Sequence, residues 1–239
     1  MIEPDLQADM SERVDRILQR CADACRRAGR SPDDVGLVAV SKKFPAESIC
    51  EAYRAGVTIF GESRVQEALQ KIEECPSAVE WHFIGRLQRN KVRPVVATFG
   101  TIHSVDSSEL LERVDTLAHE VGARVDVCLQ VNVSGEASKC GVAPDAALPI
   151  VEQAQALRSA RLVGLMTLPT FTPDPEDARP YFRSLRELRD ALVDRTGADL
   201  PQLSMGMSHD FEVAIEEGAT WVRVGSAIFG KRAIQADAE

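Results

Sequence analysis

Short apolar runs alternate with amphipathic stretches along this sequence, and that alternation limits the folds open to it. The runs are bounded by turn residues and are rich in β-branched side chains, as buried strands are. Eight strands are expected, at residues 36–42, 58–61, 81–85, 101–105, 125–133, 162–168, 202–207 and 221–225.

Helical patterns occupy the stretches between these runs, and one more precedes the first run. The expected helices are residues 10–28, 46–56, 64–74, 90–98, 107–121 with Ser107 as N-cap, 144–157, 176–195, 210–217 and 226–232. Eight strand–helix units are typical of a (β/α)8 barrel. We therefore predict an α/β fold, a single (β/α)8 TIM barrel over residues 1–239 with an extra N-terminal helix.

A doubly wound open sheet is the alternative fold. It seldom uses eight strands at so regular a spacing, and it prefers a glycine-rich turn after the first strand. The corresponding segment here, SKKFPAE at 41–47, contains no glycine.

Lys42 is expected to close the first strand. Alternation along a strand places Val38, Val40 and Lys42 on one face and Lys43 on the other. In a barrel, Lys42 would be the topmost inward residue at the carboxyl end, where active sites of this fold lie. A lysine in line with buried valines loses hydration, so its pKa falls and its neutral amine can form a Schiff base with an aldehyde. The alternative is a lysine whose ammonium group reaches solvent at a strand end.

The last two strand–helix junctions combine glycine with serine. Strand seven ends in Met205-Gly206-Met207-Ser208, and strand eight ends in Val224-Gly225-Ser226. In this architecture the commonest phosphate site lies after strands seven and eight, at helix N-termini. Two ordinary N-caps are the alternative explanation for the serines.

Arg223 lies between Val222 and Val224 on strand eight. If the valines pack on helices, Arg223 points into the barrel, where a permanent charge requires a partner. A salt bridge to an inward carboxylate is one possibility, and a heteroaromatic ring nitrogen is the other. A Schiff-base lysine, a phosphate site and an arginine at a ring nitrogen together indicate pyridoxal 5'-phosphate (PLP).

Longer motifs carry a family resemblance over about residues 10–232. They are LVAVSK at 37–42, FGES-RVQEA at 60–68, WHFIGRLQRNK at 81–91, QVNVSGEASKCGV at 130–142, GLMTL at 164–168 and LSMGMSHDFEVAIEEGATWVRVGSAIFGKR at 203–232. In these motifs the chain resembles the pyridoxal phosphate homeostasis family, whose fold is similar to the N-terminal barrel of alanine racemase, a fold type III PLP-binding barrel.

The resemblance implies a set of PLP-binding residues. Lys42 matches the lysine that forms the Schiff base, and Arg223 matches the residue at the pyridine nitrogen. The remaining cofactor-binding positions implied are Ser63, Met207, Ser208, Gly225 and Ser226.

Three positions depart from the family pattern. Ser63 replaces the usual asparagine of FGEN, which puts an amide contact to the cofactor in doubt. Arg86 replaces a proline after WHFIG and adds a cation there. His209-Asp210 replaces an acidic pair and places an imidazole near the expected phosphate, with a surface histidine as the alternative.

The resemblance favours a PLP carrier over a catalyst. A PLP-dependent racemase-like or aldolase-like enzyme needs an acid or base besides the lysine, and racemases of this fold take theirs from another domain, which is not expected here. Tyr53 and Tyr181 fall in expected outer helices, while His82 and His209 remain candidate bases. A class I aldolase-like barrel without PLP is a third possibility, but it would leave Arg223 without a ring nitrogen.

Composition narrows the expected partners. The 37 acidic and 28 basic residues give a net charge of −9, which argues against nucleic acid or an anionic membrane as partner. The sequence contains neither a spanning apolar stretch nor a signal peptide, so a cytoplasmic protein is expected. Cys21 and Cys25 share a helix face without further ligands, so no metal site is expected. The resemblance implies PLP-dependent apo-enzymes as recipients and a monomer or weak dimer.

Overall fold

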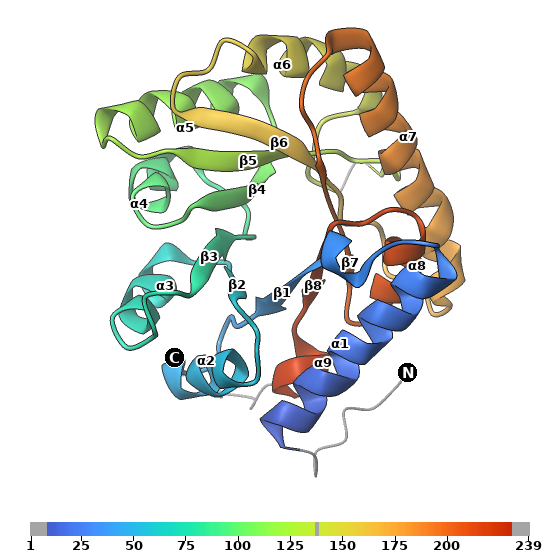
Figure 1. Cartoon of the computed structure of the whole chain (residues 1–239). Helices are drawn as coiled ribbons and strands as arrows, with labels where there is room; N and C mark the ends of the chain where they lie inside the picture. The colour runs from blue at the N-terminus through green and yellow to red at the C-terminus, as the bar shows by residue number, and fades with distance from the viewer. Residues whose placement is uncertain (1–8, 137–138, 231–239) are drawn as a thin grey trace.

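Eight parallel strands close into a barrel. In a computed structural model that describes residues 9–136 and 139–230, the strands pair in chain order and β8 pairs back with β1. They are β1 (Gly36–Val40), β2 (Ile59–Glu62), β3 (Glu80–Phe83), β4 (Thr101–Val105), β5 (Val125–Gln130), β6 (Ala160–Met166), β7 (Gln202–Met207) and β8 (Trp221–Val224). Helices surround the barrel (Figure 1). The predicted (β/α)8 fold is confirmed, and the open-sheet alternative is wrong.

The helices occupy the predicted stretches with shorter bounds. They are α1 (Met10–Arg27), α2 (Ala46–Arg54), α3 (Val65–Ile72), α4 (Val92–Val96), α5 (Ser108–Glu120), α6 (Ala147–Ala154), α7 (Arg179–Thr196), α8 (Phe211–Glu216) and α9 (Ser226–Phe229). Ser107 caps α5, as expected, by accepting the Leu110 N–H. None of these helices, within the described ranges, is long and apolar enough to cross a bilayer. Residues 231–232 of the last expected helix lie outside the described residues.

Short 3-10 turns account for the later start of three helices. They cover Arg89–Lys91 before α4, Pro144–Ala146 before α6 and Pro175–Ala178 before α7, and a fourth, Pro32–Asp34, precedes β1. Proline stands at the first position of all but the α4 turn, where its fixed φ starts a helical turn and its missing N–H costs no hydrogen bond.

Helix α1 covers the outer side of the last units of the barrel. It packs on α8 and α9, as Figure 1 shows. Arg13 donates to the Ile228 carbonyl at 2.7 Å, and Arg20 pairs with Glu212 at 2.7 Å. The extra helix is therefore an integral layer, which compensates for the four-residue length of α9.

Side chains alternate across β1 and β8 as predicted. Leu37, Ala39, Val222 and Val224 belong to the large apolar cluster between sheet and helices. A second, separate cluster of Cys128, Val163 and Met166 fills part of the barrel interior and packs with Leu168 and Trp221. The sheet separates the two clusters, as the period of two along each strand requires.

The interior also holds two histidines, which departs from the expected layers of branched side chains. His82 on β3 and His103 on β4 are 4% and 0% exposed. Their ring nitrogens lie 2.9 Å apart, and both rings pack against Trp221, with centroids 5.1 and 5.0 Å away. Burial lowers the pKa of His82 to about 4 and the pKa of His103 well below its usual range, so both imidazoles are neutral.

Lys42 lies in a turn beyond β1, so the expectation that the strand extends to residue 42 is wrong. The strand ends at Val40, and Lys42 is half-buried. Lys43 has a φ of 68°, a left-handed conformation that costs a non-glycine residue about 1 kcal/mol. A strand cannot continue through that backbone conformation, and a surrounding structure must hold it in place.

A buried ion pair beneath the turn holds its backbone on both sides of Lys42. Lys71 on α3 pairs with Glu62 at 2.6 Å and with Glu67 at 2.7 Å. The Lys71 ammonium also donates to the Ser41 carbonyl at 3.0 Å, while Glu67 accepts the Lys43 N–H. We call Glu62, Glu67 and Lys71 the turn clamp. It fixes the residue before Lys42 and the residue after it.

Acidification is expected to destabilise the fold through the interior histidines. Between pH 6.5 and 4 an unfolded histidine binds a proton that folded His82 does not, so the free energy of unfolding falls as pH falls. A pKa of about 4 against an unfolded value of about 6.5 corresponds to about 3 kcal/mol for His82.

Urea denaturation at several pH values between 7 and 4.5 measures this loss. His82→Gln should have a shallower pH dependence than wild type over that range, whereas the exposed His119→Gln should match wild type. Equal slopes for wild type and His82→Gln would contradict the assignment of His82 as a neutral buried group.

Breaking the turn clamp is expected to destabilise the protein strongly. Lys71→Met would leave the Glu62 carboxylate, which is 0% exposed, without its cation, and removing one partner of a buried pair typically costs about 3–5 kcal/mol. Urea denaturation gives the change, with the exposed Lys91→Met as a control expected within about 0.5 kcal/mol of wild type. A loss for Lys71→Met no larger than for Lys91→Met would show that the clamp carries no stability.

Candidate functional site

Four adjacent strands bring the predicted site residues to one end of the barrel. Because all strands are parallel, the segments after β7, β8, β1 and β2 leave the same end of the barrel. Val40 pairs with Gly61, and a Cβ on Gly225 would lie 3.3 Å from the Val40 Cβ. Lys42 therefore follows a strand end that touches both neighbouring segments, the one with Ser63 and the one with Gly225.

An aromatic contact joins the Lys42 turn to the last helix. The rings of Phe44 and Phe229 stack with centroids 5.0 Å apart. Phe229 is the last residue of α9 and Ser226 is its first. The turn after β1 and the segment after β8 thus form one packed unit, although they lie at opposite ends of the sequence.

The serines after β7 and β8 do not act as N-caps. Asp210 occupies the N-cap position of α8, and Gly225 occupies that of α9. Neither helix has an N-cap hydrogen bond from a side chain, and this includes the serine hydroxyls. The Ser208 hydroxyl instead accepts the Gly225 N–H at 3.1 Å, across the two junctions. The N-cap explanation of the serines is wrong, and Ser208 and Gly225 meet where a phosphate site is expected.

Asp210 shapes the segment that follows β7. Its carboxylate accepts the Met207 N–H at 2.6 Å. Burial raises the pKa of this carboxyl, and the bond from Met207 opposes that shift. The contact closes the turn that contains Ser208 and engages the backbone N–H of Met207.

Arg223 points into the barrel as predicted and is 4% exposed. Its guanidinium donates from Nη1 to the Ser204 hydroxyl at 2.5 Å and from Nη2 to the Thr167 carbonyl at 2.9 Å. Within the described ranges, the ion pairs include none between Arg223 and a carboxylate, so the salt-bridge alternative is not supported. Burial lowers its pKa to about 10, and the charge of Asp210 opposes that shift.

The Arg223 guanidinium therefore has N–H groups left to donate to a further acceptor. It carries five N–H groups, and the two bonds to neutral acceptors use only part of them. A buried charge held by neutral acceptors alone is costly, and a further acceptor at the barrel mouth would lower that cost.

Ser63 lies in the bend after β2, half-buried and in close contact with the β3 segment. A Cβ on Gly85 would lie 2.4 Å from the Ser63 carbonyl oxygen. Glycine at position 85 is therefore required by the close approach of the Ser63 backbone.

His209 contacts a neighbouring loop. Its Nε2 lies 3.1 Å from the Thr172 carbonyl and 3.2 Å from the Pro173 carbonyl, and its ring lies on Phe171 at 5.1 Å. The imidazole thus bridges the β6–α7 loop to the β7–α8 segment, which supports a structural role over one at the phosphate. Arg86, the other departure, is exposed.

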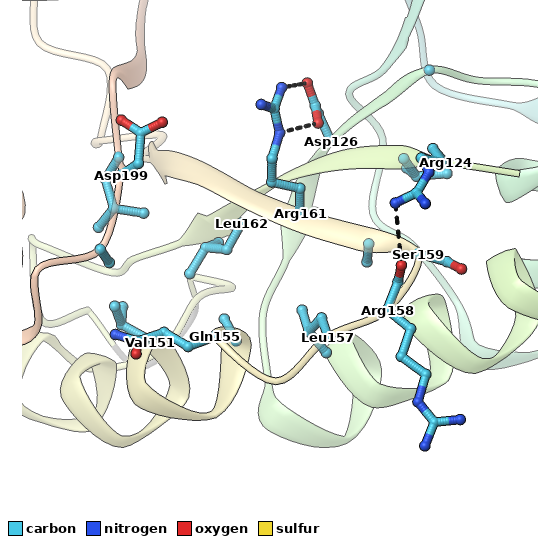
Figure 2. A pocket seen from close by; sticks show the side chains of 16 residues that line it. Arg124, Asp126, Val151, Gln155, Leu157, Arg158, Ser159, Arg161, Leu162 and Asp199 are labelled. Atoms are coloured by element: carbon cyan, nitrogen blue, oxygen red, sulfur yellow. Dashed lines mark hydrogen bonds and ion pairs between the residues drawn. The ribbon is translucent and has the colours of Figure 1, made fainter.

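A cavity of about 710 Å³ lies at the other end of the barrel (Figure 2). Residues at the amino ends of β5 and β6 line this cavity, together with three arginines, Arg124, Arg158 and Arg161. Arg161 is held by Asp126 through two bonds of 2.9 and 2.8 Å, and Arg124 donates to the Arg158 carbonyl. Barrel active sites lie at the carboxyl ends of strands, so we place the candidate site at Lys42 and not in this cavity.

Two groups of residues were missed by sequence reasoning. The turn clamp contains one local signal, the i,i+4 spacing of Glu67 and Lys71 on a helix. His103 and Ser204 were missed because their importance depends on which strands face each other across the barrel. Alternation along β4 and β7 would have placed both side chains inside.

Comparison with known proteins shows the family to which the chain belongs. The family model for the alanine racemase N-terminal domain matches residues 13–233. The pyridoxal phosphate homeostasis protein of Aquifex aeolicus is 48% identical over 222 residues, which covers 92% of this chain and 97% of that protein.

Solved structures share the barrel. PipY of Synechococcus elongatus with PLP bound superposes with a TM-score of 0.81 at 37% identity, over 93% of this chain and all of PipY. D-threonine aldolase from Filomicrobium marinum shows the fold alone, with a TM-score of 0.70 at 18% identity over 91% of this chain and 60% of the aldolase. The chain belongs to the alanine racemase N-terminal domain family and, within it, to the pyridoxal phosphate homeostasis proteins.

Proposed function

We propose that this protein binds PLP at the mouth of the barrel, holds it as a Schiff base on Lys42 and acts in PLP homeostasis. The observation that carries the proposal is the meeting of three features at one barrel end. These are the clamped turn of Lys42, the Ser208–Gly225 contact and the buried Arg223 guanidinium.

The residues present fit the groups of this cofactor. Ser208, Gly225 and Ser226 would hold the phosphate through their hydroxyls and backbone, and a phosphate would compete with Ser208 for the Gly225 N–H. Arg223 would donate to the ring nitrogen, which is the kind of neutral acceptor it already uses at Ser204 and Thr167. The structure of PipY, a protein 37% identical to this chain, has PLP bound.

Each end of the site has a separate task. When bound, PLP supplies an aldehyde for the Schiff base and a conjugated ring that can accept electrons from a substrate. The turn clamp holds the backbone on both sides of Lys42, and the Ser208–Gly225 junction would hold the phosphate. Arg223, a guanidinium that only donates, would keep the ring nitrogen of a bound PLP unprotonated and would thereby weaken the ring as an electron acceptor.

The candidate bases named from the sequence are engaged elsewhere, which supports a carrier over a catalyst. His82 is buried against His103, and its pKa of about 4 makes it a weak base. His209 is bound to the β6–α7 loop. Tyr53 and Tyr181 lie on the outer helices α2 and α7. The relatives' name, homeostasis protein, agrees with this reading.

Replacement of Lys42 should abolish covalent PLP attachment. Wild type mixed with PLP and reduced with borohydride should carry the label on the peptide containing Lys42, read by mass spectrometry. Lys42→Arg keeps the charge but cannot form a Schiff base, so it should carry no label. Lys43→Arg is the matched control and should label like wild type. Labelling of Lys42→Arg at Lys43 would overturn the assignment of the anchor.

PLP-loaded protein should not turn over amino acids. Incubation with L-alanine, D-serine or L-threonine should give no racemised or cleaved product by chiral chromatography, since a second base beside the lysine is required. Turnover that disappears in Lys42→Arg would establish the enzyme alternative and contradict the carrier proposal.

A further inference from the structure

A row of hydrogen-bonded side chains crosses the barrel interior and ends at Arg223. It runs from His82 on β3 through His103 on β4 and Ser204 on β7. His82 Nδ1 lies 2.9 Å from His103 Nε2, and His103 Nδ1 lies 2.7 Å from the Ser204 hydroxyl. Ser204 in turn accepts from Arg223 Nη1 at 2.5 Å. The side chains of this row are all at most 4% exposed.

The donors and acceptors in this row can be assigned from Arg223 onward. A guanidinium only donates, so the Ser204 oxygen is an acceptor in its bond to Arg223. Its single hydrogen then goes to His103 Nδ1, which must be unprotonated. The neutral His103 carries its hydrogen on Nε2 and donates it to His82 Nδ1.

The opposite direction leaves a buried donor without an acceptor. If His103 Nδ1 donated to Ser204, the serine oxygen would accept twice and its own hydrogen would have no acceptor in the row. An unmade hydrogen bond at a buried group is unfavourable. The row therefore runs from Arg223 to His82 and requires both histidines to be neutral.

The charged surroundings are consistent with neutral histidines. Burial disfavours an imidazolium at His103, and so do a charge on His82 and the positive charge of Arg223. The carboxylates that oppose these effects are Asp126 on β5, which acts on His82, and Asp210 after β7, which acts on Arg223. Cys128 on β5 also faces Arg223. No acid in this set acts on His103 itself.

We propose that His103, acting through Ser204, is a positioning residue that fixes the Arg223 guanidinium for recognition of the PLP ring nitrogen. Ser204 and the Thr167 carbonyl accept from two different guanidinium nitrogens and so fix the orientation of its plane. His103 keeps the serine hydrogen turned away from Arg223, so that the serine lone pairs face the guanidinium. This inference rests on the proposed PLP function.

An analogue without the ring nitrogen isolates this role. In 1-deaza-PLP a C–H replaces the ring nitrogen, while the aldehyde and phosphate are kept. The ratio of the dissociation constants for 1-deaza-PLP and PLP therefore reports recognition of the ring nitrogen alone. A general loss of stability or of phosphate binding would weaken both ligands and leave the ratio unchanged.

Wild type should bind PLP about tenfold or more tightly than 1-deaza-PLP, since the contact is a charge-assisted hydrogen bond. Ser204→Ala and His103→Leu should bring the ratio close to that of Arg223→Leu, the reference for complete loss. His103→Asn should retain most of the wild-type ratio, because its side-chain oxygen can accept the Ser204 hydrogen near the position of Nδ1. The exposed His119→Gln should match wild type.

Two results would overturn the inference. One is a wild-type ratio in Ser204→Ala, a small change that keeps the protein testable if His103→Leu does not fold. The other is a loss in His103→Asn equal to that in His103→Leu, which would exclude the acceptor role. Absence of borohydride-fixed PLP on wild-type Lys42 would instead mark the failure of the proposed function.

Discussion

The pairing of β1 with β8 is the contact on which the rest of this structure depends. Gly36 to Ala39 pair in register with Trp221 to Val224, so the first and last strands share a hydrogen-bonded edge. This closure places the turn of Lys42 beside Gly225 and inserts Arg223 into an enclosed interior. Without it, the two halves of the candidate site would lie on opposite edges of an open sheet.

The cost of burying a charged side chain explains the contacts of Lys71 outside the sheet and of Arg223 inside it. Outside the barrel Lys71 pairs with both Glu62 and Glu67, and inside it Arg223 is held by neutral acceptors only. Desolvation of each cation must be offset by contacts. On the outer side the partners are carboxylates, and they stabilise the backbone around Lys42. On the inner side the Arg223 guanidinium can still donate to an acceptor at the barrel mouth.

The fold was predictable from sequence, and the site was predictable in part. Periodicity located all eight strands and placed Arg223 inside, because each depends on residues close in the chain. The end of β1 was misplaced, since we extended the alternation through Ser41 to Lys42, whereas Lys43 adopts a left-handed conformation held by α3. The turn clamp and the His103–Ser204 contact join residues from different strand–helix units. A local sequence pattern does not indicate which strands or helices will be in contact.

The packing of α1 on the last helices has a consequence for biosynthesis. Arg13 bonds to the carbonyl of Ile228, 215 residues further along the chain, and β1 finds its second neighbour only in β8. The amino-terminal segments leave the ribosome first, whereas their packing partners β8, α8 and α9 are synthesised last. The segments therefore stay exposed until the end of synthesis. A partial chain would expose the edge of β1 and the apolar side of α1, features that favour aggregation and chaperone binding. The candidate site is therefore complete only after that last step, since Arg223 and Gly225 come from the final strand and the segment after it.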